Sequence, residues 1–400
     1  MLIRPFRALR PLLEFMPQVV CVPYDVISTN EARQLGHGKP HSFLHVIRPE
    51  IGLPASIDIH DDLVYERGAT ELERLESDGV MVREQVPSIY VYRLDVMGQA
   101  QTGVFTCVSV KEYDSNKILK HEMTRPDKED DRTRHILTQR AHAEPVMLAH
   151  QPDMQIAGLI HRTTEVAPLY DITTDDGVRH TIWRSDEVDS WIEAFARLEQ
   201  LYVADGHHRC KAASRAYEVM KEVGDKDAAE AAYFPAVLFS TDQMQIMAYN
   251  RVVHHASHEN VEMLFNDYSV IESGVKVPDS KGKVCVYTHG EWKTIRLNAP
   301  KDRSDAVKSL DVTLLQEQVL ERYFGIGDPR TDNNISFIGG IRGTDELEML
   351  VNAGQANIAF SMYPTSIDEL IEVSDQHRLM PPKSTWFEPK LRSGFLVHTF

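Results

Sequence analysis

The chain has 400 residues, and its 60 acidic and 43 basic side chains give a formal net charge of -17. A chain of this length is longer than one that usually folds around a single hydrophobic core, so it predicts two domains. No cluster of Lys and Arg indicates a nucleic-acid partner, and no stretch reaches the roughly 18 apolar residues of a membrane span. Arg and Pro interrupt the N-terminal segment, unlike a signal peptide, and the cysteines lie far apart without a CxxC pair. We therefore expect a cytoplasmic protein that binds neither nucleic acid nor membrane.

Strand and helix patterns alternate along the chain, which favours a mixed α/β fold of the α+β kind. The expected strands are 42–47, the hairpin of 88–96 with 103–110, 234–240, a second hairpin over 284–297 and 356–362. The expected helices are 58–77, 127–142, 186–199, 207–223, 311–323 and 365–374. The segment 378–394 is dense in Pro, Lys and hydroxyl residues and is expected to be a loop.

Chemistry-bearing residues thin out after "YNRVVHHASHEN", which begins at Tyr249. A new series of strands and helices follows this segment. We therefore expect a catalytic region over residues 1–255 and a C-terminal α/β domain over residues 256–400.

The most charged turn of the chain interrupts a short apolar run. "LYVA" ends at Asp205 and Gly206, and His207, His208 and Arg209 then open an amphipathic helix pattern. A strand that passes through a glycine turn into a helix start binds anions, because backbone N–H groups and the helix dipole face the ligand. Asp205 would cap the helix, hold a metal ion or accept a proton. The plain alternative is an N-cap followed by a polar helix start.

Two other segments carry ionisable groups at the ends of expected elements. "KHEMTR" contains His121, Glu122 and Arg125 in a loop, where catalytic groups are often placed. "VPYDVIS" presents Asp25 before Ser28, which is typical of an N-cap, so a simple turn explains this segment equally well.

Further candidates include three basic residues. Arg251 lies in "YNRVV", and Lys383 and Lys390 lie in "MPPKSTWFEPK". The Lys-Ser-Thr triplet has no glycine cradle and is not a P-loop. Each of these residues alone is a weak signal.

Together these motifs resemble known proteins. "VADGHHR" is similar to the signature turn of the ParB/sulfiredoxin superfamily, which includes the free L-serine kinases. The whole chain resembles a bacterial and archaeal family known as a domain of unknown function. The blocks that carry this resemblance are "PFRALRP", "VPYDVIS", "SFLHVIRPE", "HEMTRPDKEDDR", "ADGHHRCKAA", "YNRVV" and "MPPKSTWFEPKLRSG". The resemblance implies a ParB/sulfiredoxin-like core with large insertions and a C-terminal α/β extension.

The resemblance also implies an activity, the transfer of a phosphoryl group to L-serine from ATP, ADP or pyrophosphate. The residues of the turn, Asp205 to Arg209, would contact the donor phosphates, and Mg²⁺ would neutralise them with help from Asp205. An upstream carboxylate acts as the base on the serine hydroxyl, for which Glu122 is preferred and Asp25 is the second candidate.

The remaining candidates would bind the substrate or the transferred group. Lys383 and Arg125 would stabilise charge on the phosphoryl group. Arg251 would pair with the carboxylate of the amino acid, and His121 would lie in the same substrate site. The partners expected are thus an amino acid and a phosphate donor, and a homodimer is left open.

Two other classes of function compete with a kinase. The same turn would serve a nucleotide-binding regulator that senses CTP or ATP without turnover. A metal-dependent hydrolase would need histidines at metal-ligand spacing, but the 18 histidines are scattered without an HxH or HExxH motif.

Overall fold

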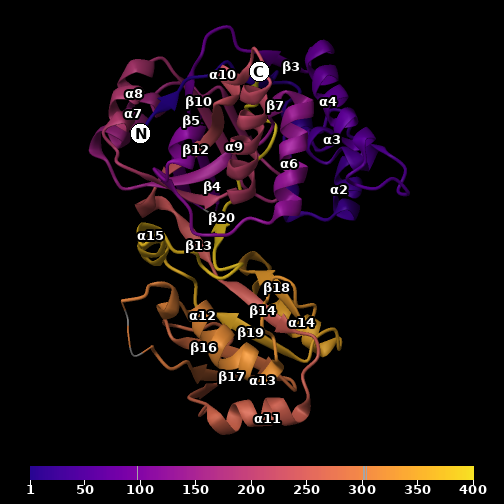
Figure 1. The fold of residues 1–400 in the computed structure, drawn as a ribbon, viewed down its shortest axis with the longest axis vertical. Coiled ribbons are helices and arrows are strands. Elements are labelled where there is room, and N and C mark those ends of the chain that lie inside the picture. The colour runs from indigo at the N-terminus through magenta and orange to yellow at the C-terminus, as the bar shows by residue number, and fades with distance from the viewer. Residues whose placement is uncertain (97, 301, 303) are drawn as a thin grey trace. The chain divides into compact units, whose positions relative to one another are not determined.

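The computed structural model of the chain describes residues 1–96, 98–300, 302 and 304–400. Contacts between Cα atoms divide the chain into two units (Figure 1). The first unit comprises Met1–Lys120, Thr124–Met244 and Pro389–Phe400, and the second comprises His121–Met123 and Gln245–Glu388. The end of the chain thus returns to the first unit, while the expected division after residue 255 is kept as a prediction.

The first unit is built on a mixed sheet of nine described strands. In spatial order these are β6 (Ile118–Leu119), β11 (Leu201–Asp205), β8 (Val146–His150), β12 (Tyr233–Ser240), β5 (Gln99–Ser109), β4 (Ile89–Val96), β10 (Arg179–Ser185) and β9 (Tyr170–Thr173), with β1 (Ile3–Arg4) beside β5. The pairs β6–β11 and β8–β12 are parallel and the other pairs are antiparallel. Two short pairs lie outside this sheet: β2 (Leu9–Pro11) with β3 (Met81–Arg83), and β7 (Ala141–His142) with β21 (His398–Thr399).

Each described helix of the first unit buries apolar side chains in the interior of that unit. They are α1 (Met16–Val19), α2 (Thr29–Gly36), α3 (Leu44–Ile47), α4 (Asp62–Ser77), α5 (Val110–Asp114), α6 (Pro126–Gln139), α7 (Met154–Thr164), α8 (Val188–Ala196), α9 (His207–Glu222) and α10 (Ala228–Ala231), with 3₁₀ turns η1 (Tyr24–Val26), η2 (Pro49–Gly52) and η3 (Thr241–Gln243). Trp191 and Phe195 of α8 share one core cluster with Cys210 of α9 and with strand residues such as Leu148. Helices α6 and α9 lie side by side (Figure 1).

The C-terminal tail contributes an aromatic anchor to the same unit. The ring of Phe395 lies 5.7 Å from that of Tyr92, 6.0 Å from that of Tyr170 and 5.6 Å from that of His180, centroid to centroid. All four side chains are buried. Apolar burial of this size, about 1.5–3 kcal/mol for each large side chain, holds the tail against β4, β9 and β10.

The second unit has its own six-stranded sheet among the described residues. In spatial order its strands are β15 (Glu272–Ser273), β17 (Glu291–Arg296), β16 (Lys283–Thr288), β19 (Ile358–Met362), β14 (Tyr249–Val253) and β18 (Ile335–Gly339), and β13 (Gln245–Met247) pairs separately with β20 (Trp386–Glu388). The helices are α11 (His258–Asp267), α12 (Asp311–Leu315), the π-helix η5 (Gln316–Leu320), α13 (Glu321–Phe324), α14 (Gly343–Asn352) and α15 (Ile367–Asp375), with 3₁₀ turns η4 (Val307–Ser309) and η6 (Gly340–Arg342). Leu347 of α14 packs with Val252 and Ala359 of the sheet.

The mixed α/β fold expected from the sequence is confirmed, and most expected elements are present. Both hairpins form, as β4–β5 and as β16–β17. Two local predictions are wrong. The apolar run at 42–47 contains the short helix α3 instead of a strand, because a short buried apolar run does not distinguish the two. Part of the expected loop at 378–394 forms the strand β20, which pairs with β13. None of the described helices is long and apolar enough to span a membrane.

Candidate functional site

The charged turn lies between β11 and α9, as the sequence predicts. Strand β11 ends at Asp205, and Gly206 has φ 102° and ψ 29°, a left-handed conformation that side chains other than glycine rarely adopt. A Cβ atom at this position would lie 2.9 Å from Cγ1 of Val146. Both the backbone conformation and the close packing therefore require glycine at position 206.

Helix α9 begins directly after this glycine. No side chain of the described residues caps its N-terminus. The helix has 16 residues, long enough to give its N-terminus a partial positive charge of about half an elementary charge. An anion at this turn would therefore be stabilised by both the N–H groups and the dipole.

Arg209 lies under the turn and is held by three groups. Its Nη2 donates to Oδ2 of Asp205 at 2.8 Å and lies 3.8 Å from Oδ2 of Asp25, and its Nη1 donates to the carbonyl of Pro145. Its Nε is buried, has no hydrogen-bond partner among the described residues, and lies 3.2 Å from the Cβ position of Gly206. A buried guanidinium nitrogen without a partner is costly, so Nε is a donor suited to a ligand atom at the turn.

Asp205 is shared by two cations. Its Oδ1 accepts from Nζ of Lys390 at 2.9 Å, and its Oδ2 accepts from Arg209. Burial opposes the ionisation of this carboxyl, but the positive charges of Lys390 and Arg209 outweigh burial and hold its pKa well below the usual range. Asp205 is therefore a charged carboxylate at neutral pH, and it orients both cations.

Asp25 lies in η1, and its side chain is 38% exposed. Asp25 lies next to Arg209. It is the more accessible of the two carboxylates there, because the Asp205 side chain is 27% exposed and bonded to two cations. A carboxylate that is open to solvent and oriented by a neighbouring arginine can accept a proton from a bound hydroxyl group.

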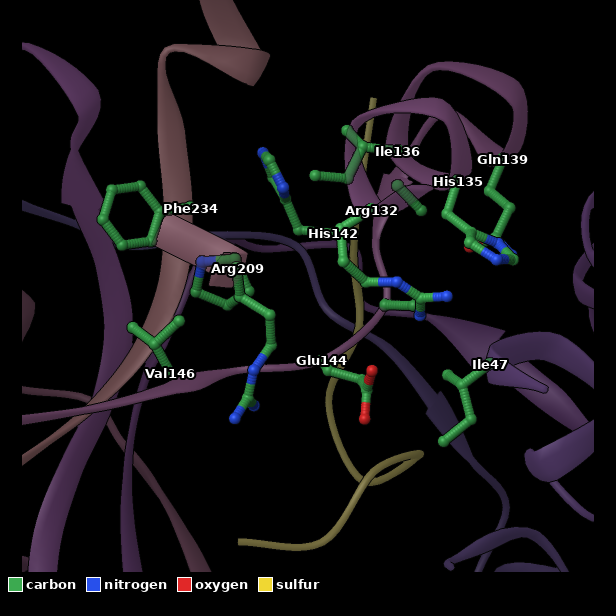
Figure 2. Close-up of a pocket in the computed structure, with 13 residues that line it drawn as sticks. Ile47, Arg132, His135, Ile136, Gln139, His142, Glu144, Val146, Arg209 and Phe234 are labelled. Carbon is green, nitrogen blue, oxygen red and sulfur yellow. The ribbon is translucent and has the colours of Figure 1, made fainter. Parts of the chain in front are cut away.

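Glu144 connects the turn to two distant segments of the first unit. Its Oε1 accepts from the backbone N–H of Tyr24 at 3.2 Å and from Oγ of Ser393 at 2.7 Å. Burial raises its pKa, while the nearby Arg209 opposes this rise. Figure 2 shows its carboxylate between Arg209 and Arg132, beside a cavity of about 40 Å³. Glu144 therefore fixes η1, and with it Asp25, against the C-terminal tail.

The two histidines of the turn differ in burial. His207 is buried, with 5% of its surface exposed, and His208 is half-buried. Nε2 of His208 accepts from the backbone N–H of Arg125 at 3.1 Å, which ties the N-terminus of α6 to the turn. The guanidinium of Arg125 itself pairs with Asp127 at 2.8 Å. The cysteine beside the turn is not a nucleophile at neutral pH, because burial raises the pKa of Cys210 to about 12.

The other predicted residues lie in the second unit. Arg251 is buried in β14, and its Nη2 donates to the carbonyl of Lys383 at 3.1 Å. His121 meets the same loop, since its Nε2 lies 3.3 Å from Oγ1 of Thr385 and its carbonyl accepts from the N–H of Met380. Glu122 follows His121 in this unit. The loop 380–385 thus brings His121, Arg251 and Lys383 together.

A larger cavity, of about 500 Å³, lies elsewhere in the first unit. Its size is within the range of small-molecule pockets. Burial raises the pKa of the thiol of Cys21 on its wall well above the usual value, so this thiol stays protonated at neutral pH. The walls are formed by Pro17, Gln18, Val20, Cys21, Val22, Leu35, Lys39, Ser42, Leu44, Ile172, Thr173, Thr174, Asp175, Asp176 and Arg392.

Comparison with protein families gives one match that covers most of the chain. The model of the family described as "Protein of unknown function (DUF1015)" matches residues 3–313. The chain belongs to this family. No curated protein matches the DUF1015 chain.

Solved structures give distant similarities to this DUF1015 member. A free serine kinase in complex with AMP is 14% identical, with a TM-score of 0.37, and the match covers 74% of this chain and 91% of that one. SbnI from Staphylococcus aureus with a C-terminal truncation is also 14% identical, with a TM-score of 0.38 and coverages of 74% and 87%. A conserved hypothetical protein from Pyrococcus furiosus is 13% identical, with a TM-score of 0.35 and coverages of 73% and 95%. At such scores no residue of these proteins can be matched to one of this DUF1015 chain, and the relation to the ParB/sulfiredoxin superfamily stays a prediction.

Two residues of the site were not assigned a role from the sequence. Lys390 was a weak candidate in a segment expected to be a loop, and Glu144 was not a candidate at all. Lys390 lies 185 positions after Asp205 in the DUF1015 chain, and no spacing rule links residues so far apart. Glu144 precedes Pro145 just before β8, and nothing in this local sequence marks it as part of a site. Only its contacts with Tyr24 and Ser393 show that it belongs to the site.

Proposed function

We propose that this DUF1015 member is a phosphotransferase that phosphorylates a small hydroxyl compound, most simply free L-serine to O-phospho-L-serine. The phosphoryl donor is ATP, ADP or pyrophosphate. The observation that carries the proposal is the turn from β11 to α9, where a left-handed glycine, an uncapped helix start and a buried arginine nitrogen without a partner among the described residues meet. Each of these three features favours a bound phosphate.

The reaction is an in-line transfer that needs positioning and charge stabilisation more than covalent chemistry by the protein. The hydroxyl oxygen of serine attacks the terminal phosphorus of the donor. The new O–P bond forms as the bond from phosphorus to the bridging oxygen breaks, and the shortened donor leaves with that electron pair. The hydroxyl proton passes to a carboxylate of the protein.

We propose Asp25 as this carboxylate. It lies beside Arg209, it is more exposed than Asp205, and its position is set by the bond from the N–H of Tyr24 to Glu144. Glu122, the base preferred from the sequence, is the alternative. Asp205 has a different role, since it orients Arg209 toward the donor.

The residues of the second unit keep the roles proposed from the sequence. Arg251 suits the carboxylate of an amino acid because its guanidinium contacts carbonyl oxygens and the ring of Phe337 and has no carboxylate partner among the described residues. Burial lowers its pKa to about 10, so it is still cationic at neutral pH and would gain from a desolvated anionic partner. Lys383 would stabilise charge on the transferred group, a role also proposed for Arg125 of the first unit, and His121 would line the substrate site.

A divalent cation such as Mg²⁺ neutralises phosphate oxygens in reactions of this class. Asp205 was the ligand expected for it. Both oxygens of Asp205 accept hydrogen bonds from cationic side chains, an arrangement that already balances its charge and does not fit a metal ligand. We therefore assign no step of the reaction to a metal held by Asp205.

The first test is an assay for phosphoserine with L-serine, Mg²⁺ and each donor in turn. We expect product with at least one donor, and we expect Asp25→Asn to lower kcat by about 100-fold or more, the usual loss on removing a general base. Asp78→Asn, at an exposed helix end, is the matched control and should keep the wild-type rate. The absence of product with every donor would refute the kinase. A normal rate for Asp25→Asn with a large loss for Glu122→Gln would move the base to Glu122.

The same purified protein can be used to distinguish the kinase from the nucleotide-binding regulator considered from the sequence. Calorimetry that shows binding of ATP or CTP, with no turnover of any donor and a change in oligomeric state, would favour the regulator. Binding that is accompanied by phosphoserine formation would exclude it.

A further inference from the structure

The C-terminal tail brings Lys390 to the turn, and hydrogen bonds fix the tail just after this residue. Cys21 and Ser393 exchange backbone hydrogen bonds at 3.1 and 3.0 Å, and Leu9 and Val397 exchange two at 2.9 Å. Ser393 also donates to Glu144. Lys390 is three residues before Ser393, in a segment beyond the part of the chain that the family model matches. Its place next to Asp205 is therefore set by tertiary contacts.

We propose that Lys390 is a further catalytic residue, which contacts the phosphate of the donor at the start of α9 while Asp205 holds it there. The catalytic role of Lys390 rests on the proposed function, but its contact with phosphate does not, because phosphate binding can be measured without turnover.

The geometry supports such a contact. Nζ of Lys390 lies 2.9 Å from Oδ1 of Asp205, the residue directly before Gly206. Asp205 therefore places a positive charge beside the helix start where the phosphate would bind. The side chain of Lys390 is only 14% exposed, so its charge is weakly screened by solvent and acts strongly on a nearby anion.

Lys390 and Arg209 are suited to different parts of this task. Arg209 is a rigid planar group, fixed by the carbonyl of Pro145 and by Asp205. Lysine is a compact charge with three donors on a flexible stem, so it can follow a phosphoryl group as charge moves toward the leaving oxygen. Asp205 is the positioning residue for both cations, which explains why a carboxylate stands at a site that binds phosphate.

The experiment measures binding of inorganic pyrophosphate by titration calorimetry at constant ionic strength. We expect Lys390→Met to weaken binding by about tenfold or more, as the loss of a charged hydrogen bond predicts, and Lys390→Arg to lose less. Lys211→Met removes a charge of the same sign from the second turn of α9 and is the matched control, with less than about twofold loss expected since it lies outside the contact. Wild-type affinity in Lys390→Met would overturn the proposal.

A double variant separates a phosphate contact from a purely structural ion pair. Asp205→Asn removes the negative charge but keeps a side-chain oxygen that still accepts a hydrogen bond from Nζ of Lys390, so Lys390 stays at the turn. We therefore expect this variant to bind pyrophosphate better than Lys390→Met does, and we expect adding Lys390→Met to it to cost affinity again. If both single variants and the double variant lose the same affinity, Lys390 acts only through Asp205 and the proposal is refuted. Thermal melting curves check that each variant is folded.

These measurements also distinguish failure of the Lys390 proposal from failure of the proposed kinase activity. Binding of pyrophosphate that depends on Lys390, without phosphoserine formation by the wild type, would refute the kinase and retain the contact. Phosphoserine formation at an unchanged rate in Lys390→Met would refute the catalytic role of Lys390 and retain the kinase.

Discussion

At the scale of single residues, Gly206 decides whether the turn can form. Its left-handed backbone and the 2.9 Å approach of Val146 to the position of a Cβ atom leave room for no side chain. Gly224, beyond the other end of α9, is also left-handed, with φ 67°, but has no atom within 4 Å of the Cβ position. A side chain at Gly224 would therefore meet backbone strain alone, whereas one at Gly206 would meet both backbone strain and a steric clash with Val146.

We expect Gly206→Ala to destabilise the protein by about 1–3 kcal/mol from strain alone, with a further cost from the contact with Val146. Gly224→Ala should cost about 1 kcal/mol. Only Gly206→Ala should weaken pyrophosphate binding, because only that position shapes the turn. Urea unfolding and calorimetry measure both effects. Equal stability of the two variants, or normal binding by Gly206→Ala, would contradict this account of the turn.

The three carboxylates near the turn differ in burial and in their partners. Asp205 is bonded to two cations, Glu144 is buried behind Arg209, and Asp25 is the most exposed carboxylate. A sequence shows three acidic residues without this order. The difference matters because a carboxylate that orients a cation, one that holds a backbone segment and one that accepts a proton need different surroundings.

At the scale of elements, the segment around Asp25 depends on the helix that follows it. Ser28 caps α2 in a capping box, in which its Oγ accepts from the N–H of Glu31 and the carboxylate of Glu31 accepts from the N–H of Ser28. The N-terminus of α2 therefore fixes the direction in which the chain leaves η1. This N-cap was predicted from the sequence and is confirmed.

We expect Ser28→Ala to destabilise the first turn of α2 by about 1 kcal/mol. Hydrogen exchange at the amide of Glu31 should then be about fivefold faster, by the same free energy. Ser77→Ala is the control, since Oγ of Ser77 donates to the carbonyl of Arg74 within α4 and caps no helix start. Unchanged exchange at Glu31 would show that the cap does not hold this segment.

At the scale of the whole molecule, the first unit buries several histidines in its core. His142, His180 and His398 are each less than 5% exposed. Burial lowers the pKa of all three, that of His180 to about 3 with help from the charge of Arg392. These rings are held neutral among aromatic partners such as Phe395 and Phe400.

This burial predicts instability in mild acid. The pKa of each histidine is lower in the folded state than the value of about 6.5 in an unfolded chain, so the unfolded state binds protons first as the pH falls. Stability should be complete above about pH 6.5 and should decrease toward pH 5, by up to about 1.4 kcal/mol per pH unit for each histidine. Melting temperatures between pH 7.5 and 5 measure this dependence. His180→Gln should show a shallower decrease, and His161→Gln, at a histidine whose side chain is 76% exposed, should follow the wild type. Equal melting temperatures at pH 7.5 and 5 would refute the prediction.

Local patterns were sufficient for much of the fold. The hairpins β4–β5 and β16–β17 and the start of α9 were predicted because each depends on residues close in the chain. The helix at 44–47 was missed because a short, mostly apolar run buries equally well in a helix or a strand. Strand β20 was missed because its partner β13 is about 140 positions away, and pairing over that separation leaves no local signal.

The sequence by itself determined that the chain has a mixed α/β fold and that Asp205 to Arg209 form a strand, a glycine turn and a helix start, because dihedral preference and periodicity act over a few residues. The tertiary structure alone decided which charges surround that turn. It brought Asp25 and Lys390 to the turn, and it placed Glu144 between the N-terminal segment and the tail. It also grouped Arg251 and Lys383 in the second unit. Ion pairs between residues that are distant in the chain form only where packing of the tail and the sheet has already fixed their positions.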